Sequence, residues 1–153
     1  MTKIITLTQG REAIVDDEDY EYLNQWKWFY ARCGYATGHV NCHSKTVYMH
    51  RVIMETPTGM ETDHVNGDKL DNRKNNLRMC TSQQNKANKT KENNNTSGYK
   101  GVTWDKSRKT WNAKIMINYK CINLGRFVNI VDAARAYDEA ATKLFCNFAK
   151  TNF

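Results

Sequence analysis

Four polar residues within residues 61–88 have the side-chain types that phosphodiester hydrolysis requires. Asp63 and His64 are adjacent, and Asn76 and Asn85 follow them. Cutting a phosphodiester needs a base that works near neutral pH and an electropositive partner for the charge that grows on the leaving oxygen. Because imidazole alone titrates unperturbed in that range, His64 is the candidate base. Asp63 offers a hard oxygen ligand suited to magnesium, and Asn85 offers a second, neutral one.

The elements that must position these residues are a strand, a turn-rich loop and a short polar helix. Neighbouring residues of a strand point to opposite faces, so Asp63 and His64 are expected to face different sides. An isolated Asp-His pair is a weak signal, because short motifs match many unrelated proteins. The longer pattern around the pair is therefore the stronger evidence.

That pattern is DH, then NGDKLDN, then NNLR, then the asparagine of QQN. It resembles the core of the HNH endonucleases, in particular the phage and intron-encoded homing type. The resemblance implies a ββα-metal unit, in which a two-stranded hairpin and a helix hold one divalent metal. It implies that Asp63 and Asn85 bind this metal, that His64 is the general base, and that Asn76 braces the loop that orients the base. The last family position is often histidine, so Asn85 favours magnesium or manganese and makes zinc unlikely.

The composition bounds the class of protein. A chain of 153 residues fits one domain or two small ones, and a formal charge of +7 with a pI near 9.2 favours a polyanionic partner such as DNA. From charge alone, a basic protein without such a partner is equally well supported. Five cysteines at irregular spacing make no disulfide framework, and no apolar run or signal segment predicts a membrane or an export route. We expect a cytoplasmic protein of a bacterial or phage-infected cell.

Residues 1–60 are expected to form a scaffold that leads into the motif. They carry 6 basic and 7 acidic residues, so no excess of positive charge indicates a nucleic-acid-binding surface. The residue pattern predicts a strand over Ile4–Thr8, a helix capped by Asp16 or Asp17, strands over 28–40 and 46–49, and a helical turn over 50–54.

A zinc site is the alternative use of the residues Cys33, Cys42, His43 and His50. Their spacing lacks the paired clips of structural zinc modules, although whether Cys33, Cys42 and His43 bind a metal is left open. His50 and Arg51 stand where homing HNH enzymes often have a His-Arg pair. Together with Arg78 they are predicted phosphate contacts.

Residues 86–96, KANKTKENNNT, lack apolar periodicity and predict a connector. We therefore expect a nuclease module over 1–92, with its motif core at 61–88, a linker over 93–97 and a second module over 98–153.

The second module is predicted to be a three-stranded antiparallel sheet packed on one helix. Strand candidates cover 99–104, 111–117 and 121–124, and Asn129 is the expected cap of the helix. The helix has one apolar stripe, made of Ile130, Ala133, Ala134, Tyr137, Ala140, Ala141 and Leu144. The fold class is therefore α+β, a ββα-metal module followed by this sheet and helix.

Alternation along the middle strand separates a buried face from an exposed one. Trp111, Ala113, Ile115 and Ile117 share the face expected against the helix, and the residues between them share the other face. Residues 98–153 carry 10 basic and 4 acidic residues, hence +6 of the total charge of +7. This concentration indicates a binding surface for a polyanion, with a merely solvated charged sheet as the alternative.

Three segments carry a second resemblance: SGYKGVTWDKSRKTWNAKI, LGRF and AARAYDEAATKLFCNFAKTNF. They resemble the plant ethylene-response-factor domain of the APETALA family, which also occurs fused to HNH nucleases in phages. The resemblance implies a sheet that lies in the major groove of DNA. Several plant arginines are replaced here, so the plant target sequence does not transfer. The predicted DNA-binding residues are Lys100, Thr103, Lys106, Arg108, Asn112, Lys114, Met116 and Asn123.

Together these observations predict a metal-dependent, site-specific DNA endonuclease of the homing type that acts on double-stranded DNA. The alternative is a sequence-specific DNA-binding regulator with an inactive nuclease core. One active site per chain implies nicking, unless two chains meet as a homodimer on DNA.

Overall fold

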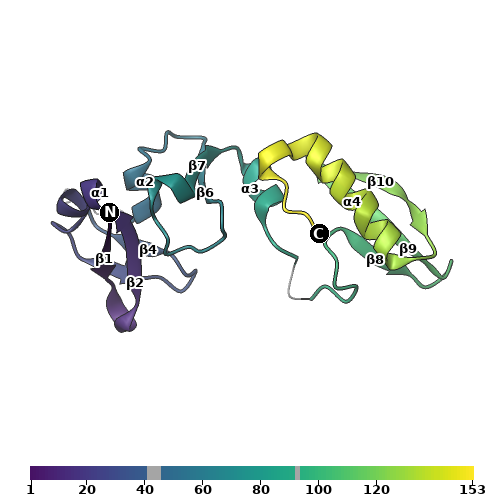
Figure 1. The fold of residues 1–153 in the computed structure, drawn as a ribbon, viewed down its shortest axis with the longest axis horizontal. Coiled ribbons are helices and arrows are strands. Elements are labelled where there is room, and N and C mark those ends of the chain that lie inside the picture. Colours follow the sequence, from purple (N-terminus) through teal and green to yellow (C-terminus); the bar gives the residue numbers. More distant parts are fainter. Residues whose placement is uncertain (41–45, 92–93) are drawn as a thin grey trace. The chain divides into compact units, whose positions relative to one another are not determined.

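The protein is seen in a computed structural model that describes residues 1–40, 46–91 and 94–153 (Figure 1). The chain forms two compact units, Met1–Ser82 and Gln83–Phe153. Both units combine small sheets with a few helices, so the chain has a mixed α and β structure. Among the residues described, no helix combines the length and apolar character needed to cross a membrane.

Two small antiparallel sheets and two short helices open the first unit. β1 (Thr2–Thr6) pairs with β2 (Glu12–Asp16), and a 3-10 turn, η1 (Thr8–Gly10), joins them. The other sheet has the order β3-β4-β5, and its strands are β3 (Trp28–Tyr30), β4 (Ala36–Gly38) and β5 (Val47–Tyr48). The helices are α1 (Asp17–Leu23) and α2 (Met49–Ile53). The sequence predicted the first strand two residues too late and did not predict β2.

The core of this unit forms where α1 and α2 meet these sheets. It consists of Ile5, Leu7, Ala13, Val15, Leu23, Trp28, Ala36, Val40 and Met49. Asp16 precedes α1, as expected of a cap, but its side chain makes no cap hydrogen bond. Its Oδ2 instead accepts a hydrogen bond from Lys74 N at 2.7 Å, so it ties the helix start to the loop before β7.

A two-stranded hairpin completes the first unit. β6 (Glu61–His64) pairs antiparallel with β7 (Leu77–Cys80), and the connecting loop contains a 3-10 turn, η2 (Lys74–Asn76). The helix α3 (Ser82–Asn88) follows β7 in the chain. From Gln83 onward this helix belongs to the second unit.

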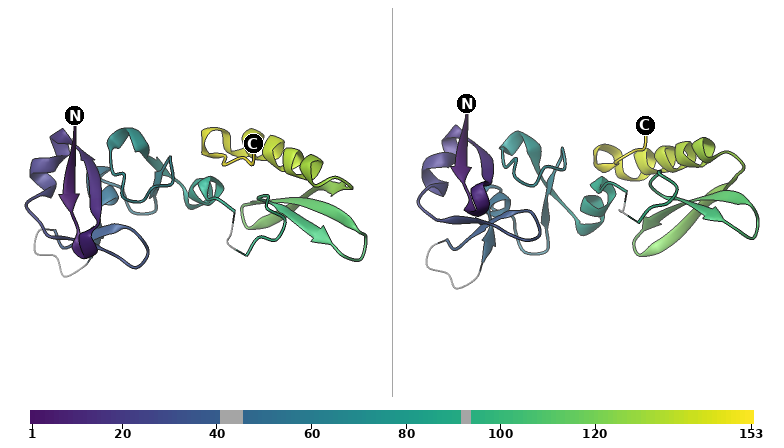
Figure 2. Two further views of the ribbon diagram at one scale, coloured as in Figure 1. Left: turned by 60° about the horizontal axis from the view of Figure 1, so that its bottom comes forward. Right: turned by 90° about the horizontal axis from the view of Figure 1, so that it is seen from below.

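The second unit contains a three-stranded antiparallel sheet of order β10-β9-β8. Its strands are β8 (Val102–Asp105), β9 (Thr110–Ile117) and β10 (Lys120–Phe127), followed by α4 (Ile130–Phe145) and a 3-10 turn, η3 (Cys146–Phe148). Asn129 caps α4 as predicted, because its Oδ1 accepts a hydrogen bond from Val131 N at 2.8 Å. Figure 2 shows α4 lying along one face of this sheet.

An apolar stripe of α4 packs on β9. Its buried members are Ala133, Ala134, Tyr137, Ala141 and Phe145, and Ala113 and Ile115 face them from the strand. The sequence placed Leu144 in this stripe, but its side chain is 41% exposed. Phe145 takes that place because it follows Tyr137 and Ala141 at steps of four residues, on the same face of the helix.

Gly101 lies at the entrance to β8, where the chain passes under α4. Its φ is +74°, and a Cβ at this position would lie 2.0 Å from Cδ2 of Tyr137. Only glycine combines this backbone conformation with this close approach.

The two units divide at Ser82, earlier than the linker predicted over 93–97. The reason is that Ala87 is buried in one cluster with Ile115 and Phe145, while its carbonyl accepts a hydrogen bond from Lys150 N at 3.2 Å. The linker includes residue 93, which lies outside the described residues, and it stays a prediction.

Candidate functional site

Asp63 and His64 lie on β6 with side chains 6% and 4% exposed. Asp63 is directly opposite Arg78 in the hairpin, and its Oδ2 accepts from Nε at 3.0 Å and from Nη2 at 2.8 Å. An ionised carboxylate buried to this degree needs such a partner. Arg78, which the sequence predicted to contact phosphate, therefore pairs with the predicted metal ligand.

His64 is held by Asn72, which is fully buried. Nε2 of His64 lies 3.3 Å from Oδ1 of Asn72, and Nδ2 of Asn72 donates to the carbonyl of Leu70 at 3.2 Å. Because the amide nitrogen of Asn72 is the donor to Leu70, its oxygen must accept from His64. This network assigns the proton to Nε2 and leaves Nδ1 as the basic nitrogen.

The electrostatic environment favours the neutral form of His64. Burial lowers the pKa of His64 below its ordinary value, while the hydrogen bond to Asn72 and the nearby Asp63 act in the opposite direction. A neutral imidazole is the form that can accept a proton from water.

Aromatic rings surround the candidate base. The ring centroids of His50 and Tyr35 lie 5.0 and 5.8 Å from that of His64, and Tyr48 stacks on His50 at 5.5 Å. Burial lowers the pKa of His50 to about 3, and its Nδ1 is buried with no hydrogen-bond partner among the described residues. The prediction that His50 contacts phosphate is revised, because this neutral, buried ring packs against His64.

Asn76 joins the two ends of the loop between β6 and β7. Its Oδ1 accepts from Asn66 N at 3.0 Å, and its Nδ2 donates to Asp71 O at 2.8 Å. The Asp71 carboxylate is bound in turn by Nε and Nη2 of Arg73, each at 2.7 Å, and these bonds lower the pKa of Asp71. Asn76 is thus bonded within this loop, and its role as a brace that orients the base stays a prediction.

Arg51 differs from its predicted role as a phosphate contact. Its guanidinium donates to the carbonyls of Met60 at 3.2 Å, Thr56 at 3.4 Å and Pro57 at 3.5 Å. It therefore closes the loop that leads from α2 to the start of β6.

Asn72 and Tyr35 were missed at the sequence level. Asn72 stands in the NGDKLDN stretch, and a buried asparagine in a turn-rich loop is a signal that could have identified it. Tyr35 carries no comparable signal. It directly precedes β4, and only the fold brings it next to His64.

The donors expected to hold a metal are one carboxylate and one amide oxygen, from Asp63 and Asn85. Both are hard oxygen ligands, so their chemistry fits magnesium or manganese, which keep several waters when bound. Asn85 lies on α3, in the second unit. Within the part of the chain that is described, no three His, Cys, Asp or Glu side chains form a metal cluster. Cys33 is an exposed free thiol, whereas Cys42 and His43 lie outside the described residues.

Most of the predicted DNA-binding residues share the sheet face opposite α4. Thr103 pairs with Asn112 and Lys114 with Asn123 across the strands, and partners in a register lie on the same face. Met116 follows Lys114 by two residues and is 59% exposed, while Lys106 and Arg108 lie in the turn from β8 to β9. Asn112 differs from expectation because it is buried, at 7% exposure, in the central strand.

Arg126 joins this face although the sequence did not predict it. The register of β10 shifts between Asn123 and Gly125, so Arg126 pairs with Asn112. Strict alternation from Asn123 would have turned Arg126 towards α4. The glycine inside a strand was the available signal of such a bulge.

Lys100 was predicted to bind DNA, but its side chain makes contacts within the second unit. Its Nζ donates to the carbonyl of Ala87 at 2.5 Å and to that of Lys89 at 2.6 Å. Burial lowers the pKa of Lys100 to about 8. Its ammonium group therefore binds the end of α3 within the second unit.

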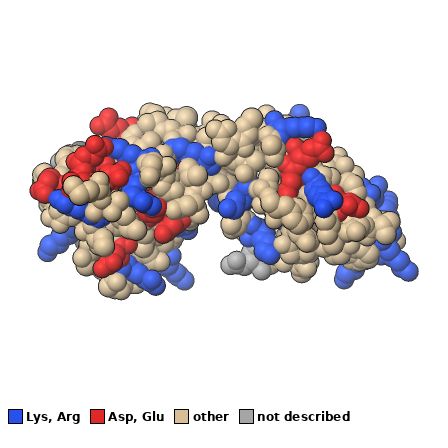
Figure 3. Space-filling model, in the orientation of Figure 1, with Lys and Arg blue, Asp and Glu red and all other residues tan. Residues whose placement is uncertain are grey.

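Surface charge differs between the two units. Figure 3 shows acidic side chains gathered over α1 of the first unit. Residues 98–153 of the second unit carry 10 basic and 4 acidic residues. The excess of positive charge accompanies the sheet, as expected for a surface that meets a polyanion.

Comparison with known proteins finds a family match in the middle of the chain. Residues 47–87 match the HNH endonuclease family model. Similar proteins include an uncharacterized HNH endonuclease of Acanthamoeba polyphaga mimivirus, 28% identical over 148 residues, which cover 94% of this chain and 76% of the relative. Another is Protein 3.8 of Escherichia phage T7, 36% identical over 59 residues, which cover 39% of this chain and about half, 49%, of the phage protein. No solved structure matches the chain.

Proposed function

We propose that this nuclease, whose residues 47–87 match the HNH endonuclease domain, is a metal-dependent, site-specific endonuclease of the homing type that cuts double-stranded DNA. The observation that carries the proposal is the state of His64. It is a buried, neutral imidazole whose Nε2 is fixed by Asn72, inside the segment that matches the family. A packing histidine would need neither this tautomer nor the adjacent carboxylate of Asp63.

In this proposal His64 is the general base. Its Nδ1 takes a proton from a water molecule placed in line with the scissile bond, and Asn72 accepts the hydrogen bond from Nε2 throughout the transfer. Asn76 keeps the loop that carries Asn72 in place. The expected products are 5′ phosphate and 3′ hydroxyl ends.

Asp63 and Asn85 are the proposed ligands of one magnesium or manganese ion. When bound, such an ion stabilises the negative charge that grows on the leaving 3′ oxygen. Asp63 forms its ion pair with Arg78 as a carboxylate, which is also the form that a metal ligand needs. Zinc suits this pair less well, because structural and catalytic zinc sites use mainly nitrogen and sulfur ligands.

DNA binding is assigned to the second unit, as in ethylene-response-factor-type domains. The outer face of β8, β9 and β10 presents Thr103, Lys114, Met116, Asn123 and Arg126, while Lys106 and Arg108 extend from the turn. Arginine is the usual reader of guanine, so Arg126 is the proposed base contact of this set. The lysines are proposed to neutralise phosphates.

The alternative function, a DNA-binding regulator with an inactive nuclease core, would use the same sheet face. Such a regulator would tolerate the loss of Asp63, His64 or Asn85. All three are present, and two hydrogen bonds of Asn72 fix the base, which favours the nuclease.

An assay on supercoiled plasmid distinguishes the nuclease from the DNA-binding regulator. We expect the full-length protein to convert plasmid to the nicked form with magnesium or manganese and to leave it intact with EDTA. Asp63→Asn should abolish nicking, whereas Glu12→Gln, which changes an exposed acid of the same unit, should not. Binding without cutting under every metal condition would support the regulator instead. Linear product without a nicked intermediate would indicate two chains acting together.

A further inference from the structure

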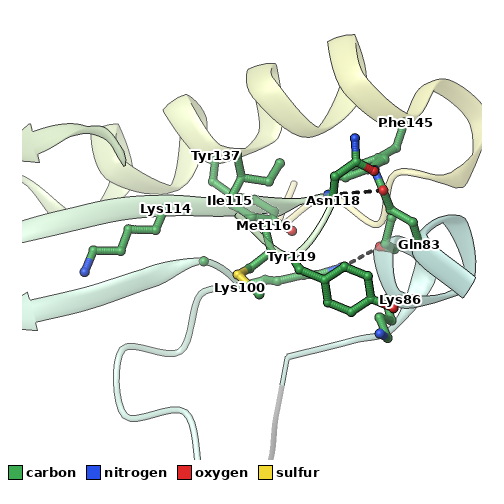
Figure 4. Close-up of a pocket in the computed structure, with 12 residues that line it drawn as sticks. Gln83, Lys86, Lys100, Lys114, Ile115, Met116, Asn118, Tyr119, Tyr137 and Phe145 are labelled. Carbon is green, nitrogen blue, oxygen red and sulfur yellow. Dashed lines mark hydrogen bonds between the residues drawn. The ribbon is translucent and has the colours of Figure 1, made fainter. Parts of the chain in front are cut away.

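A cavity of about 290 Å³ lies within the second unit, between α3, the end of β9 and α4 (Figure 4). β8 begins at Val102, opposite Ala113, whereas β9 continues to Ile117. The last residues of β9 therefore have no β8 residue beside them. The helix α3 lies next to this end of the strand, where Oε1 of Gln83 accepts from Asn118 N at 3.2 Å. The cavity is the space that remains between the strand edge and the helix.

The floor of this cavity is apolar and its rim is exposed. The floor consists of buried side chains: Ala87, Ile115, Tyr137 and Phe145. The rim consists of exposed residues, among them Lys86, Met116 and Tyr119. Small-molecule sites in proteins have volumes of about 300–1,000 Å³, so this cavity is at the lower end of their range. It has room for one small, flat, apolar group.

The charge around the cavity is positive. Among the described residues that line it are Lys86, Lys100 and Lys114, and none of those residues is an aspartate or a glutamate. The ammonium of Lys100 donates to the carbonyls of Ala87 and Lys89, whereas Lys86 and Lys114 are exposed. An anionic group at the rim is therefore favoured.

Tyr119 stands where the backbone favours glycine. It lies in the turn between β9 and β10 with a φ of +61°, next to Asn118 with a φ of +48°. Such turns favour asparagine followed by glycine, and a bulky residue with a positive φ is rare. The side chain is 86% exposed, and Nζ of Lys86 lies 5.0 Å from the centroid of its ring. Since backbone strain of this kind is concentrated at functional sites, the exposed ring at the rim indicates a stacking surface.

We propose that this cavity receives one unpaired nucleobase of a DNA strand, which stacks on Tyr119 while Lys86 and Lys114 meet the neighbouring phosphates. Every nucleobase has a flat face that stacks on aromatic rings, and in a strand it lies between phosphates. It therefore matches both the apolar floor and the positive rim. The occupant is DNA and not a free nucleotide, because the rim continues through Lys114 and Met116 into the outer face of the sheet. The inference rests on the part of the proposed function that assigns DNA binding to the second unit.

The test measures the affinity of the full-length protein for three versions of one end-labelled duplex, by fluorescence anisotropy in EDTA. One version is fully paired, one has a single-nucleotide bulge, and one has the same bulge without its base. The abasic bulge keeps the interrupted backbone of the bulged duplex, so the two differ only in the base. Stacking of one base on an aromatic side chain typically contributes about 5- to 150-fold to affinity. We expect the bulge that keeps its base to bind more tightly than the abasic bulge by a factor in that range.

Two variants test whether the cavity causes this preference. Tyr119→Gly removes the ring and leaves a residue that the turn favours, so the hairpin should fold. It should bind the two bulges equally and keep the wild-type affinity for the paired duplex. Ala87→Leu places a larger side chain on the floor of the cavity and should also remove the preference. Phe153→Ala is the matched control, because Phe153 is an exposed aromatic residue of the same unit outside this cavity, and it should keep the preference.

The remaining outcomes contradict the inference in distinguishable ways. Equal affinity of the wild type for both bulges, with the paired duplex still bound, would overturn it and leave DNA binding by the sheet intact. A preference for the base that persists in both Tyr119→Gly and Ala87→Leu would show that the base binds elsewhere. Free dAMP that binds as tightly as the bulged duplex would make a mononucleotide the ligand in place of a DNA strand. Failure to bind any of the three duplexes would reject the DNA-binding assignment of the second unit, and this inference with it.

Discussion

The hairpin of the first unit and the sheet of the second unit place their functional residues by different means. The hairpin and its loop contain four buried polar residues: Asp63, His64, Asn72 and Asn76. Each of them forms a hydrogen bond with another group of the same unit. In the sheet, the residues expected to meet DNA lie on the outer face, and apolar contacts behind them hold the fold. The proposed chemistry therefore depends on a polar network inside a loop, and the proposed DNA binding depends on a regular surface.

The basic side chains of the two regions also differ in where they point. In and beside the hairpin, basic side chains are used within the protein: Arg78 pairs with Asp63, Arg73 with Asp71, and Lys74 with Glu18 and Asp19. In the second unit, Lys114 and Arg126 project from the outer face of the sheet. A variant of the first region should therefore change the chemistry, and a variant of the outer face should change affinity for DNA.

The largest effect is expected from His64→Ala. A general base typically contributes about 10²- to 10⁴-fold, so nicking of supercoiled plasmid should fall by that factor. DNA affinity, measured by a mobility shift, should stay unchanged because the sheet is untouched. His39→Ala changes an exposed histidine of the same unit and should cut at the normal rate. A His64→Ala protein that nicks as fast as the wild type would remove the base assignment.

Stability of the second unit should depend strongly on Gly101. In Gly101→Ala the new Cβ would meet the ring of Tyr137 at 2.0 Å, and φ is +74°. Overpacking costs about 1–3 kcal/mol and the left-handed conformation about 1–2 kcal/mol, so the unit should lose roughly 2–5 kcal/mol. Hydrogen exchange of the β9 amides measures this loss directly.

Gly98→Ala is the matched control for this prediction. Gly98 has a similar φ of +80°, but a Cβ added there would meet no described atom within 4 Å beyond its chain neighbours. It should lose only the conformational part, about 1–2 kcal/mol. Equal losses in the two variants would mean that the contact with Tyr137 contributes nothing.

The two regions also differ in how far the sequence predicted them. Periodicity located the three strands and the face of α4, because regular elements repeat the same environment every two or three to four residues. The capping preference of asparagine located the start of α4 at Asn129. The periodicity assigned the wrong face to Leu144, because the apolar stripe of the helix continues through Phe145 instead. It also missed Arg126, because a bulge shifts the register of β10 before this residue. A local bulge is decided by backbone geometry that the pattern of apolar residues does not contain.

The hairpin was predicted through its resemblance to a family and not through periodicity. The motif located Asp63, His64 and Asn76, yet it did not reveal Asn72, Tyr35 or the Asp63–Arg78 pair. Such contacts join residues that lie far apart in the sequence or in an irregular loop. Only the folded chain decides which polar partner each buried group receives.

A smaller effect is expected from His50 on the pH dependence of stability. Its pKa falls from about 6.5 in the unfolded chain to about 3 in the folded protein, so the unfolded state binds the extra proton. The contribution of neutral His50 is complete above pH 6.5 and is lost as pH falls from there towards 3. Between pH 7 and pH 5 this loss is about 2 kcal/mol.

His50→Phe tests this value, because it keeps an aromatic ring beside His64 and cannot titrate. Urea unfolding at pH 7 and at pH 5 should show a loss smaller than that of the wild type by about 2 kcal/mol. An identical pH dependence in the two proteins would show that His50 accepts its proton without unfolding.

The smallest effect is expected for Lys114→Ala, and it tests which face of the second unit meets DNA. Each neutralised phosphate contributes about −0.9 to the slope of log affinity against log salt concentration, so the slope should become shallower by about that amount. Lys143→Ala is the control, because this exposed lysine lies on α4 and pairs with Glu139 at 2.7 Å. It should leave the slope unchanged. A shallower slope for Lys143→Ala with a normal one for Lys114→Ala would place DNA against the exposed side of α4 and would reject the outer face of the sheet as the binding surface.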